Sequence, residues 1–293
     1  MCCLMSDLCV VHLVRKKNGM KPFKRFVESY LSHAAGRDHD LLLVFKGFSA
    51  DENIEMYTGL LANVRYNKMY VPDVGFDIRA YMKSAAVTDY AYGYYCFLNS
   101  FSNILCDNWL LKLYSIVSQE NVGLAGATGS YESPYTHILN KPGIRKVVPV
   151  GNFWIKVPAL IVKLHDLTVK KLEQFKYKAY FDEFPNYHIQ TNAFIISGSL
   201  LKKIKCRPIL NKMAAHLFES GKNSLSKQIL NMGKEIIVVG RDGIGYRKEE
   251  WPSSRTFRNG NQENLLVGDN QTERYELSSD SDKLKFVKET WQP

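Results

Sequence analysis

Short, almost wholly apolar runs alternate with longer amphipathic stretches through the first half of the chain. The apolar runs predict buried strands at residues 8–14, 41–45, 68–71, 94–98 and 122–125. Apolar side chains recur at helical spacing between them and predict helices at residues 22–32, 79–87 and 108–118. Strands that are apolar on both faces and alternate with such helices are typical of a covered parallel sheet. The pattern therefore predicts an α/β fold with a Rossmann-like, mostly parallel central sheet and helices on both faces.

The second half of the chain is less regular. A run from Ile189 to Ser197 predicts one more strand, followed by a helix near Leu200. A short helix is predicted at residues 225–232, ended by a glycine, and a late strand follows at residues 235–239.

The C-terminal part is rich in turn-forming residues. Residues 252–282 contain many Ser, Asn, Gln, Asp and Gly, which favour loop or a mobile flap. Such a flap would close over a bound ligand with Trp251, Arg255, Phe257, Arg258 and the segment 269–272. We therefore predict one domain at residues 1–240 and a loop-rich extension at residues 241–293, packing on or covering that domain.

Composition limits the class of protein. The chain has 293 residues, 45% of them hydrophobic and 23% charged, which is ordinary for a globular protein. Its longest apolar run, at residues 157–162, is too short to cross a bilayer and contains a proline. The six cysteines are Cys2, Cys3, Cys9, Cys96, Cys106 and Cys206, and none forms a CxxC pair. Free thiols fit a reducing compartment, so we expect a cytoplasmic location.

The net charge of +10 is unevenly distributed. The segment from Lys202 to Lys234 contains eight Lys or Arg residues against Glu219 alone. A basic surface favours an anionic partner such as a diphosphate or an anionic membrane, or is simply a solvated face. No nucleic-acid-binding motif accompanies the charge, so nucleic acid is not expected as a partner.

Polar residues that directly follow strands are the first candidates for a site, because parallel sheets bind ligands at the carboxyl ends of their strands. Asn99, Ser100 and Ser102 follow the strand at residues 94–98. They indicate either a binding loop or a capped turn, in which Asn and Ser are equally common.

Two further segments place charged residues near the same edge. Arg15 begins a basic turn after the first strand, and such cations either bind a diphosphate or belong to the plain surface. Asp73 and Asp77 precede the helix at residues 79–87. Asp77 is a ligand-binding carboxylate or the N-cap of that helix.

A third segment begins at Glu219 and runs through the helix at residues 225–232 into the strand at residues 235–239. Its carboxylate either takes part in chemistry or ends a helix and pairs with Lys222.

The order of these segments over roughly residues 7–240 resembles GT-A-type nucleotide-sugar glycosyltransferases, and the Gly-x-Asp form at Gly75–Asp77 is similar to the rhamnan-synthesis type. The resemblance implies a GT-A-like fold and transfer of a sugar from a nucleotide-diphospho-sugar to a hydroxyl group. The acceptor would be a glycan or a lipid-linked molecule in surface polysaccharide biosynthesis. Glu219 would be the general base of an inverting displacement.

The resemblance also implies a role for each remaining candidate. The donor would contact Arg15, Asp73, Asp77, Asn99, Ser100 and Ser102. The acceptor or sugar would contact Thr128, Glu132, His188 and Asn192. His188 is alternatively a structural histidine bonded to a backbone carbonyl.

The chain departs from the family where a DxD-like motif would hold Mg²⁺ or Mn²⁺. Asn99, Ser100 and Ser102 stand there and offer only neutral oxygens, which bind a dication weakly. A glycosyltransferase with little metal dependence therefore competes with a catalytically inactive GT-A-like domain that binds a nucleotide or a glycan.

Overall fold

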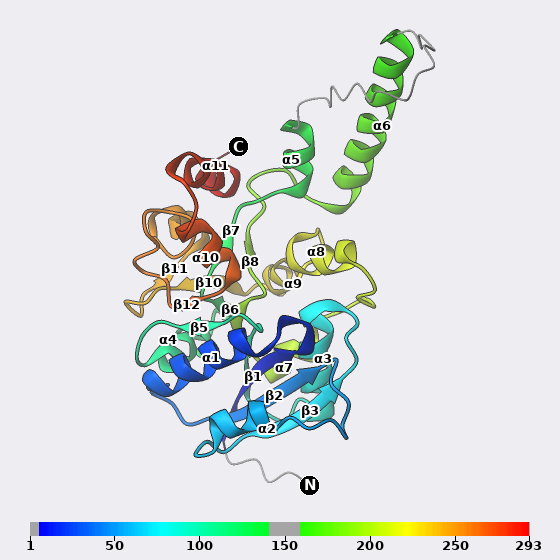
Figure 1. The fold of residues 1–293 in the computed structure, drawn as a ribbon. Coiled ribbons are helices and arrows are strands. Elements are labelled where there is room, and N and C mark those ends of the chain that lie inside the picture. The colour runs from blue at the N-terminus through cyan, green and yellow to red at the C-terminus, as the bar shows by residue number, and fades with distance from the viewer. Residues whose placement is uncertain (1–5, 141–158, 293) are drawn as a thin grey trace.

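A computed structural model describes residues 6–140 and 159–292. Its centre is an eight-stranded sheet with the strand order β11-β10-β6-β9-β4-β1-β2-β3 (Figure 1). In that order the strands are β11 (Gly245–Tyr246), β10 (Glu235–Val239), β6 (Val122–Gly126), β9 (Ala193–Ser197), β4 (Tyr94–Leu98), β1 (Leu8–Arg15), β2 (Asp40–Lys46) and β3 (Asn67–Val71). All of them run the same way except β9 and β11. The predicted α/β class with a mostly parallel sheet is confirmed.

Helices cover both faces of this sheet, and β1 shows why. Its side chains alternate, so Cys9 and Val11 enter one buried cluster while Leu8 and Val10 enter the other. The first cluster includes residues of α3 (Phe76–Val87), α8 (Lys212–Ser220) and α9 (Leu225–Asn231). The second includes residues of α1 (Met20–Ser32) and α4 (Trp109–Val117). The apolar strands of the sequence are therefore buried from both sides.

Smaller elements join this frame. They are η1 (Lys16–Asn18), α2 (Glu55–Thr58), η2 (Gly59–Leu61), β5 (Asn103–Ile104), β7 (Gly129–Ser130), β8 (His188–Ile189) and α7 (Gly198–Leu201). The helices α5 (Pro134–Asn140) and α6 (Ala159–Tyr180) project together from the body (Figure 1). Within the described ranges, no helix is both long and apolar enough to cross a membrane.

The strand predicted from Ile189 to Ser197 is wrong in one respect. The chain forms β8 at His188–Ile189, leaves regular structure at Gln190–Asn192, and resumes as β9 at Ala193. The strand β8 pairs with β7 in a separate two-stranded sheet, whereas β9 enters the main sheet. The interruption frees three polar side chains for the pocket described below.

The expectation of loop or a mobile flap at residues 252–282 is also wrong for much of that segment. It contains β12 (Val267–Gly268), α10 (Asn270–Glu276) and the start of α11 (Asp280–Trp291), and η3 (Lys248–Ser253) leads into it. Phe257 and Leu266 are fully buried. Two of the polar residues that favoured a loop prediction are N-caps: Asp269 caps α10 and Ser279 caps α11.

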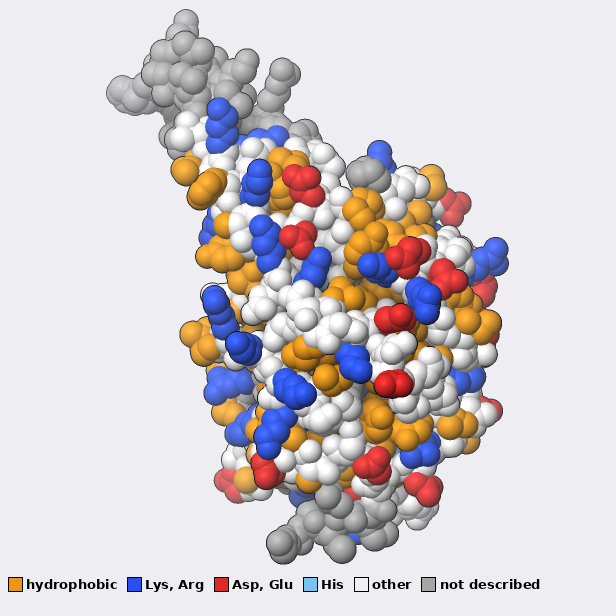
Figure 2. All heavy atoms as spheres, turned by 180° about the vertical axis from the view of Figure 1, so that it is seen from behind, with side chains coloured by type: hydrophobic (Ala, Val, Ile, Leu, Met, Phe, Trp, Pro, Cys, Tyr) orange, Lys and Arg blue, Asp and Glu red, His pale blue; other side chains and the backbone are white. Residues whose placement is uncertain are grey.

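Lys and Arg side chains gather along one side of the body, whereas Asp and Glu are more frequent on the other (Figure 2). The exposed cations of the segment predicted to be basic include Lys202, Lys203, Lys205, Arg207 and Lys212. Cys9, Cys96, Cys106 and Cys206 are free thiols. Cys2, Cys3 and the side chains of the apolar run at residues 157–162 lie outside the described residues.

Candidate functional site

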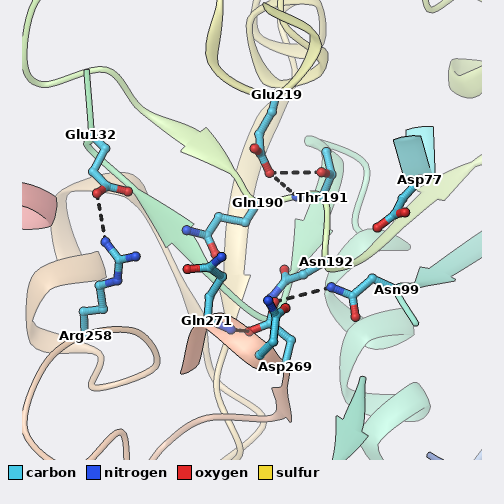
Figure 3. Close-up of a pocket in the computed structure, with 11 residues that line it drawn as sticks. Asp77, Asn99, Glu132, Gln190, Thr191, Asn192, Glu219, Arg258, Asp269 and Gln271 are labelled. Carbon is cyan, nitrogen blue, oxygen red and sulfur yellow. Dashed lines mark hydrogen bonds and ion pairs between the residues drawn. The ribbon is translucent and has the colours of Figure 1, made fainter. Parts of the chain in front are cut away.

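A pocket of about 280 Å³ lies at the edge of the sheet where β4 ends (Figure 3). Every side chain that lines it is polar or charged. The lining consists of Asp77, Asn99, Glu132, Gln190, Thr191, Asn192, Glu219, Arg258, Asp269, Asn270 and Gln271. A lining of hydrogen-bonding groups suits a hydroxyl-rich ligand and gives an apolar ligand little to contact.

The reversed strand β9 brings Asn99 and Asn192 to this edge together. Because β9 runs opposite to β4 and β6, its first residue lies beside their last residues, and Ala193 is paired with Leu98. The backbone N–H of Asn99 donates to the carbonyl oxygen of Asn192 at 2.8 Å. A purely parallel strand at this position would place its carboxyl end here instead.

Glu219 reaches the pocket from the last turn of α8. Its Oε1 accepts hydrogen bonds from the backbone N–H and the hydroxyl group of Thr191, each 2.9 Å long. Lys222 instead donates to the carbonyl oxygen of Lys178 at 2.7 Å, so the alternative pairing with Glu219 does not form. Figure 3 shows the Glu219 carboxylate directed toward the opening between the other lining residues.

Asp77 lies in the first turn of α3, which begins at Phe76 rather than at the predicted Arg79. The N-cap is Gly75, so the N-cap interpretation of Asp77 is wrong. Gly75 has φ 76°, and an added Cβ would lie 2.8 Å from the carbonyl oxygen of Ile209, so glycine is needed there. Burial raises the pKa of the Asp77 carboxyl, and the nearby ammonium of Lys46 opposes this rise.

Glu132 forms an ion pair with Arg258 on the opposite wall. Nη1 of Arg258 donates to Oε1 of Glu132 at 2.8 Å and to the hydroxyl of Thr290 at 3.1 Å. The guanidinium also packs over the rings of Phe257 and Phe286, 4.8 Å from each centroid. The pair neutralises one of the pocket's carboxylates and fixes α11 to this wall.

Asp269 combines a helix cap with a place in the lining. Its Oδ1 accepts from the backbone N–H groups of Gln271 and Thr272, at 2.9 and 3.0 Å. Its Oδ2 accepts a longer hydrogen bond of 3.4 Å from Nδ2 of Asn99. The start of α10 is thereby attached to the end of β4.

Of the proposed catalytic, donor and acceptor residues, five line the pocket: Asp77, Asn99, Glu132, Asn192 and Glu219. Arg258, Asp269, Asn270 and Gln271, which the sequence placed in a segment closing over a ligand, line it as well. Arg15 and Asp73 lie outside the lining and form an ion pair of 2.8 Å with each other. Ser100 is also outside it and accepts a 2.6 Å hydrogen bond from Asn18.

The other three candidates lie behind the lining. Ser102 is fully buried and donates to Oδ1 of Asn99 at 3.2 Å. Thr128 is fully buried and donates to Oδ1 of Asn192 at 2.9 Å. Nδ1 of His188 lies 2.7 Å from the carbonyl oxygen of Asn186, as the structural interpretation of this histidine expects. Ser102 and Thr128 therefore orient the two asparagines.

Gln190 and Thr191 also line the pocket, although sequence reasoning did not single them out. Both fell inside the run predicted as one strand. The polar triplet Gln-Thr-Asn within an otherwise apolar run was the signal for a break in the strand.

The carboxylates of the lining are not clustered as the ligands of a metal ion usually are. No group of three or more His, Cys, Asp or Glu side chains in the described ranges has a metal-binding arrangement. Glu132 is engaged by Arg258, and one oxygen of Asp269 is engaged by α10. Asn99, Ser100 and Ser102, which stand where the family places its metal-binding carboxylates, offer only neutral oxygens, so these three side chains do not fit the metal that the family resemblance implies.

No protein-family model matches the sequence, and neither does any curated protein. Solved structures with a similar fold include the mannosyltransferase PcManGT of Pyrobaculum calidifontis, studied with GDP-Man and Mn²⁺, at 10% identity over 85% of this chain and 59% of that one, with a TM-score of 0.46. The mannosyltransferase Ktr4p of S. cerevisiae is 12% identical over 68% of this chain and 57% of that one, with a TM-score of 0.39.

A third similar structure is 4-diphosphocytidyl-2C-methyl-D-erythritol synthase of Anaerococcus prevotii, 12% identical over 84% of this chain and 94% of that one, with a TM-score of 0.42. The chain thus spans less than two thirds of both mannosyltransferases. Similarity at this level establishes no shared activity, so any functional conclusion depends on the pocket itself.

Proposed function

We propose that the protein transfers a sugar from a nucleotide-diphospho-sugar to a hydroxyl group of a glycan or lipid-linked acceptor, in surface polysaccharide biosynthesis. The observation that carries this proposal is the Glu219 carboxylate, held by Thr191 at the edge of a wholly polar pocket. One of its oxygens is engaged, and no hydrogen bond to the other is found among the described residues. A carboxylate in this position can accept a proton from a bound hydroxyl group.

In the proposed reaction, Glu219 takes the proton from the acceptor hydroxyl as its oxygen attacks the anomeric carbon. The bond between that carbon and the diphosphate oxygen breaks, and the nucleoside diphosphate leaves with the electron pair. Attack from the face opposite the leaving group inverts the anomeric configuration. Asp77, Asn99 and Asn192 would contact the sugar hydroxyl groups.

The diphosphate needs positive charge as it leaves. Arg15 and Lys17 lie at the end of β1, where both pair with Asp73 at 2.8 and 3.0 Å. Lys46 is buried at the end of β2 and donates to the carbonyl oxygen of Phe76. In the proposed complex these cations offset the charge of the diphosphate, and Asp73 holds two of them in place.

The direct test is a panel of UDP-, GDP- and dTDP-sugars with the purified protein, with EDTA or with added MnCl₂. Release of the nucleoside diphosphate, with or without a sugar acceptor, supports the proposal. If no donor is hydrolysed or transferred under either condition, the transferase proposal fails.

A second candidate is a GT-A-like domain that binds a nucleotide or a glycan without turnover. The observation that favours it is the absence of a DxD-like carboxylate pair at Asn99–Ser102. Calorimetry with UDP, GDP and dTDP, run beside the donor panel, separates the two candidates. Binding without turnover supports the inactive domain.

The exposed basic residues on one side of the body favour a peripheral contact with an anionic membrane, where a lipid-linked acceptor would be presented. Co-sedimentation with phosphatidylglycerol vesicles, compared with neutral phosphatidylcholine vesicles, tests this contact. Equal sedimentation with both kinds of vesicle would contradict it.

A further inference from the structure

We infer that Asn99 and Asn192 bind the hydroxyl oxygens of the sugar directly through their amide N–H groups, with no divalent cation between the protein and the sugar. This inference rests on the proposed function and specifies how its donor is recognised. It depends on which end of each asparagine side chain faces the pocket.

The hydrogen bonds of Asn99 fix its orientation. Its Oδ1 accepts from the backbone N–H of Phe101 at 2.9 Å and from the hydroxyl of Ser102 at 3.2 Å. A backbone N–H can only donate, so the atom that faces it must be the amide oxygen. The NH₂ group is left on the side of Asp269 and the pocket.

Asn192 is oriented in the same way. Its Oδ1 accepts from its neighbour's backbone N–H, at Ala193, and from the hydroxyl of Thr128, both at 2.9 Å. Its Nδ2 is buried and has no hydrogen-bond partner within the described part of the chain. A buried donor without a partner destabilises the protein, and a ligand oxygen at this wall would remove that penalty.

These orientations decide against a metal at this position. An amide coordinates Mg²⁺ or Mn²⁺ through its oxygen. Each Oδ1 accepts from a backbone N–H and lies within hydrogen-bond distance of a hydroxyl group, although the Thr128 hydroxyl shares its one proton between Asn192 and Oε1 of Gln190. What Asn99 and Asn192 present to the pocket is N–H, which a cation repels and an oxygen lone pair attracts.

Charge selects a neutral ligand for this wall. Asp77, Glu219 and Asp269 line the same pocket, and the one arginine of the lining is already paired with Glu132. A diphosphate placed among these carboxylates would be repelled. A sugar hydroxyl both donates and accepts, so it can give its hydrogen to a carboxylate and receive one from an amide. The wall of Asn99, Asn192 and Asp269 therefore suits the uncharged sugar ring, and the diphosphate lies elsewhere.

The test is calorimetry of each sugar nucleotide of the donor panel against its plain nucleoside diphosphate, in EDTA and in MnCl₂. Taking the ratio of the two affinities isolates the sugar contact. For the wild-type protein, we expect the ratio to agree between the two conditions to within about twofold. Asn192→Asp replaces the unpartnered NH₂ group by an oxygen that can only accept. The affinity for the sugar nucleotide should therefore fall about tenfold, while the affinity for the nucleoside diphosphate stays the same.

Two further variants make the result specific. Asn121→Asp introduces the same change at an exposed position outside the pocket and should leave both affinities unaltered. Asn99→Asp keeps the acceptor for Phe101 and faces a second carboxylate, Asp269, across the present 3.4 Å hydrogen bond. It should create Mn²⁺ binding, measured by electron paramagnetic resonance, that the wild-type protein lacks. It also serves as the test if Asn192→Asp does not fold.

The outcomes separate this inference from the proposed function. Binding of the sugar nucleotide by the wild-type protein only with Mn²⁺ overturns the amide contact and leaves the transferase proposal standing. Wild-type affinities in both asparagine variants also overturn it. If the wild-type protein binds no sugar nucleotide in either condition, the proposed function fails and the inference fails with it.

Discussion

Oε1 of Glu219 accepts two hydrogen bonds from Thr191, one from its backbone N–H and one from its hydroxyl group. These residues come from α8 and from the break between β8 and β9, which are 28 positions apart in the sequence. The contact fixes the carboxylate relative to the end of the sheet. The N–H of Thr191 is available for this contact because the chain leaves regular structure at Gln190–Asn192, whereas a continuous strand would engage it in a ladder.

The first prediction concerns Glu219→Gln. The glutamine side chain keeps an oxygen that can accept both bonds from Thr191, but it cannot take up a proton as a carboxylate does. We expect turnover of the donor and acceptor to fall by about 10²–10⁴-fold, with the calorimetric affinity for the donor nearly unchanged. Glu249→Gln, at an exposed position, is the matched control. Wild-type turnover in Glu219→Gln would remove Glu219 from the mechanism.

The second prediction concerns the Arg258–Glu132 pair. The Arg258 side chain is only 9% exposed, and Arg258→Met leaves Glu132 without its cation. We expect the free energy of unfolding, from urea titration, to fall by about 2–4 kcal/mol. Arg255→Met is the control, because Arg255 is 64% exposed and meets Glu263 only at 3.8 Å. Its effect should stay below about 0.5 kcal/mol. Equal effects of the two substitutions would show that the buried pair adds nothing.

The third prediction concerns pH and His12. This histidine lies in the centre of β1, fully buried, stacked on Phe26 with ring centroids 3.5 Å apart. Burial lowers its pKa to about 3 from its ordinary value of 6.5. The unfolded chain therefore binds a proton below pH 6.5 that the folded protein does not, and stability is lost as the pH falls from 6.5 toward 3.

For this one group the loss approaches about 1.4 kcal/mol per pH unit well below its unfolded-state pKa. His12→Leu removes the group, so its free energy of unfolding should fall less steeply than that of the wild-type protein between these limits. Urea titrations at a series of pH values measure the two slopes. His137→Leu, at an exposed histidine, should keep the wild-type slope. Parallel curves for His12→Leu and the wild-type protein would contradict the prediction.

The fourth prediction concerns the segment after residue 240. Trp251 and Phe257 are fully buried, β11 pairs with β10, and β12 pairs with β5. We therefore expect a chain that ends at Gly240 to lose cooperative unfolding, because the apolar side chains that residues 241–293 cover would be exposed to water. Near-ultraviolet circular dichroism during a thermal scan measures the sharpness of the unfolding transition. A sharp transition close to that of the full chain would mean that residues 1–240 fold on their own.

The periodicity of the first half predicted the strands of its main sheet and the helices α1, α3 and α4, but not short elements such as α2 and α5. The strand at Tyr94–Leu98 has the predicted bounds, as does the late strand at Glu235–Val239. Apolar runs such as Leu8–Val14 have little alternative to burial between two layers, because both of their faces are hydrophobic. Polar segments were harder to predict, since the Asp and Ser residues that form loops also cap helices. The short helix α10 was missed for that reason.

The sequence by itself determined the alternation of strands and helices, the α/β class, and the candidacy of Asp77, Asn99, Glu132, Asn192 and Glu219. These conclusions depend on local hydrophobic pattern and on which residues follow strands, and both are properties of neighbouring positions. Only the tertiary structure decided that β9 is reversed, that Asn99 therefore meets Asn192, and that Arg258 pairs with Glu132 at the same pocket. The hydroxyl that reaches Oδ1 of Asn192 comes from Thr128, 64 positions away in the sequence, and the acceptor of the Asn99 NH₂ group is Asp269, 170 positions away, so no local pattern carries these contacts.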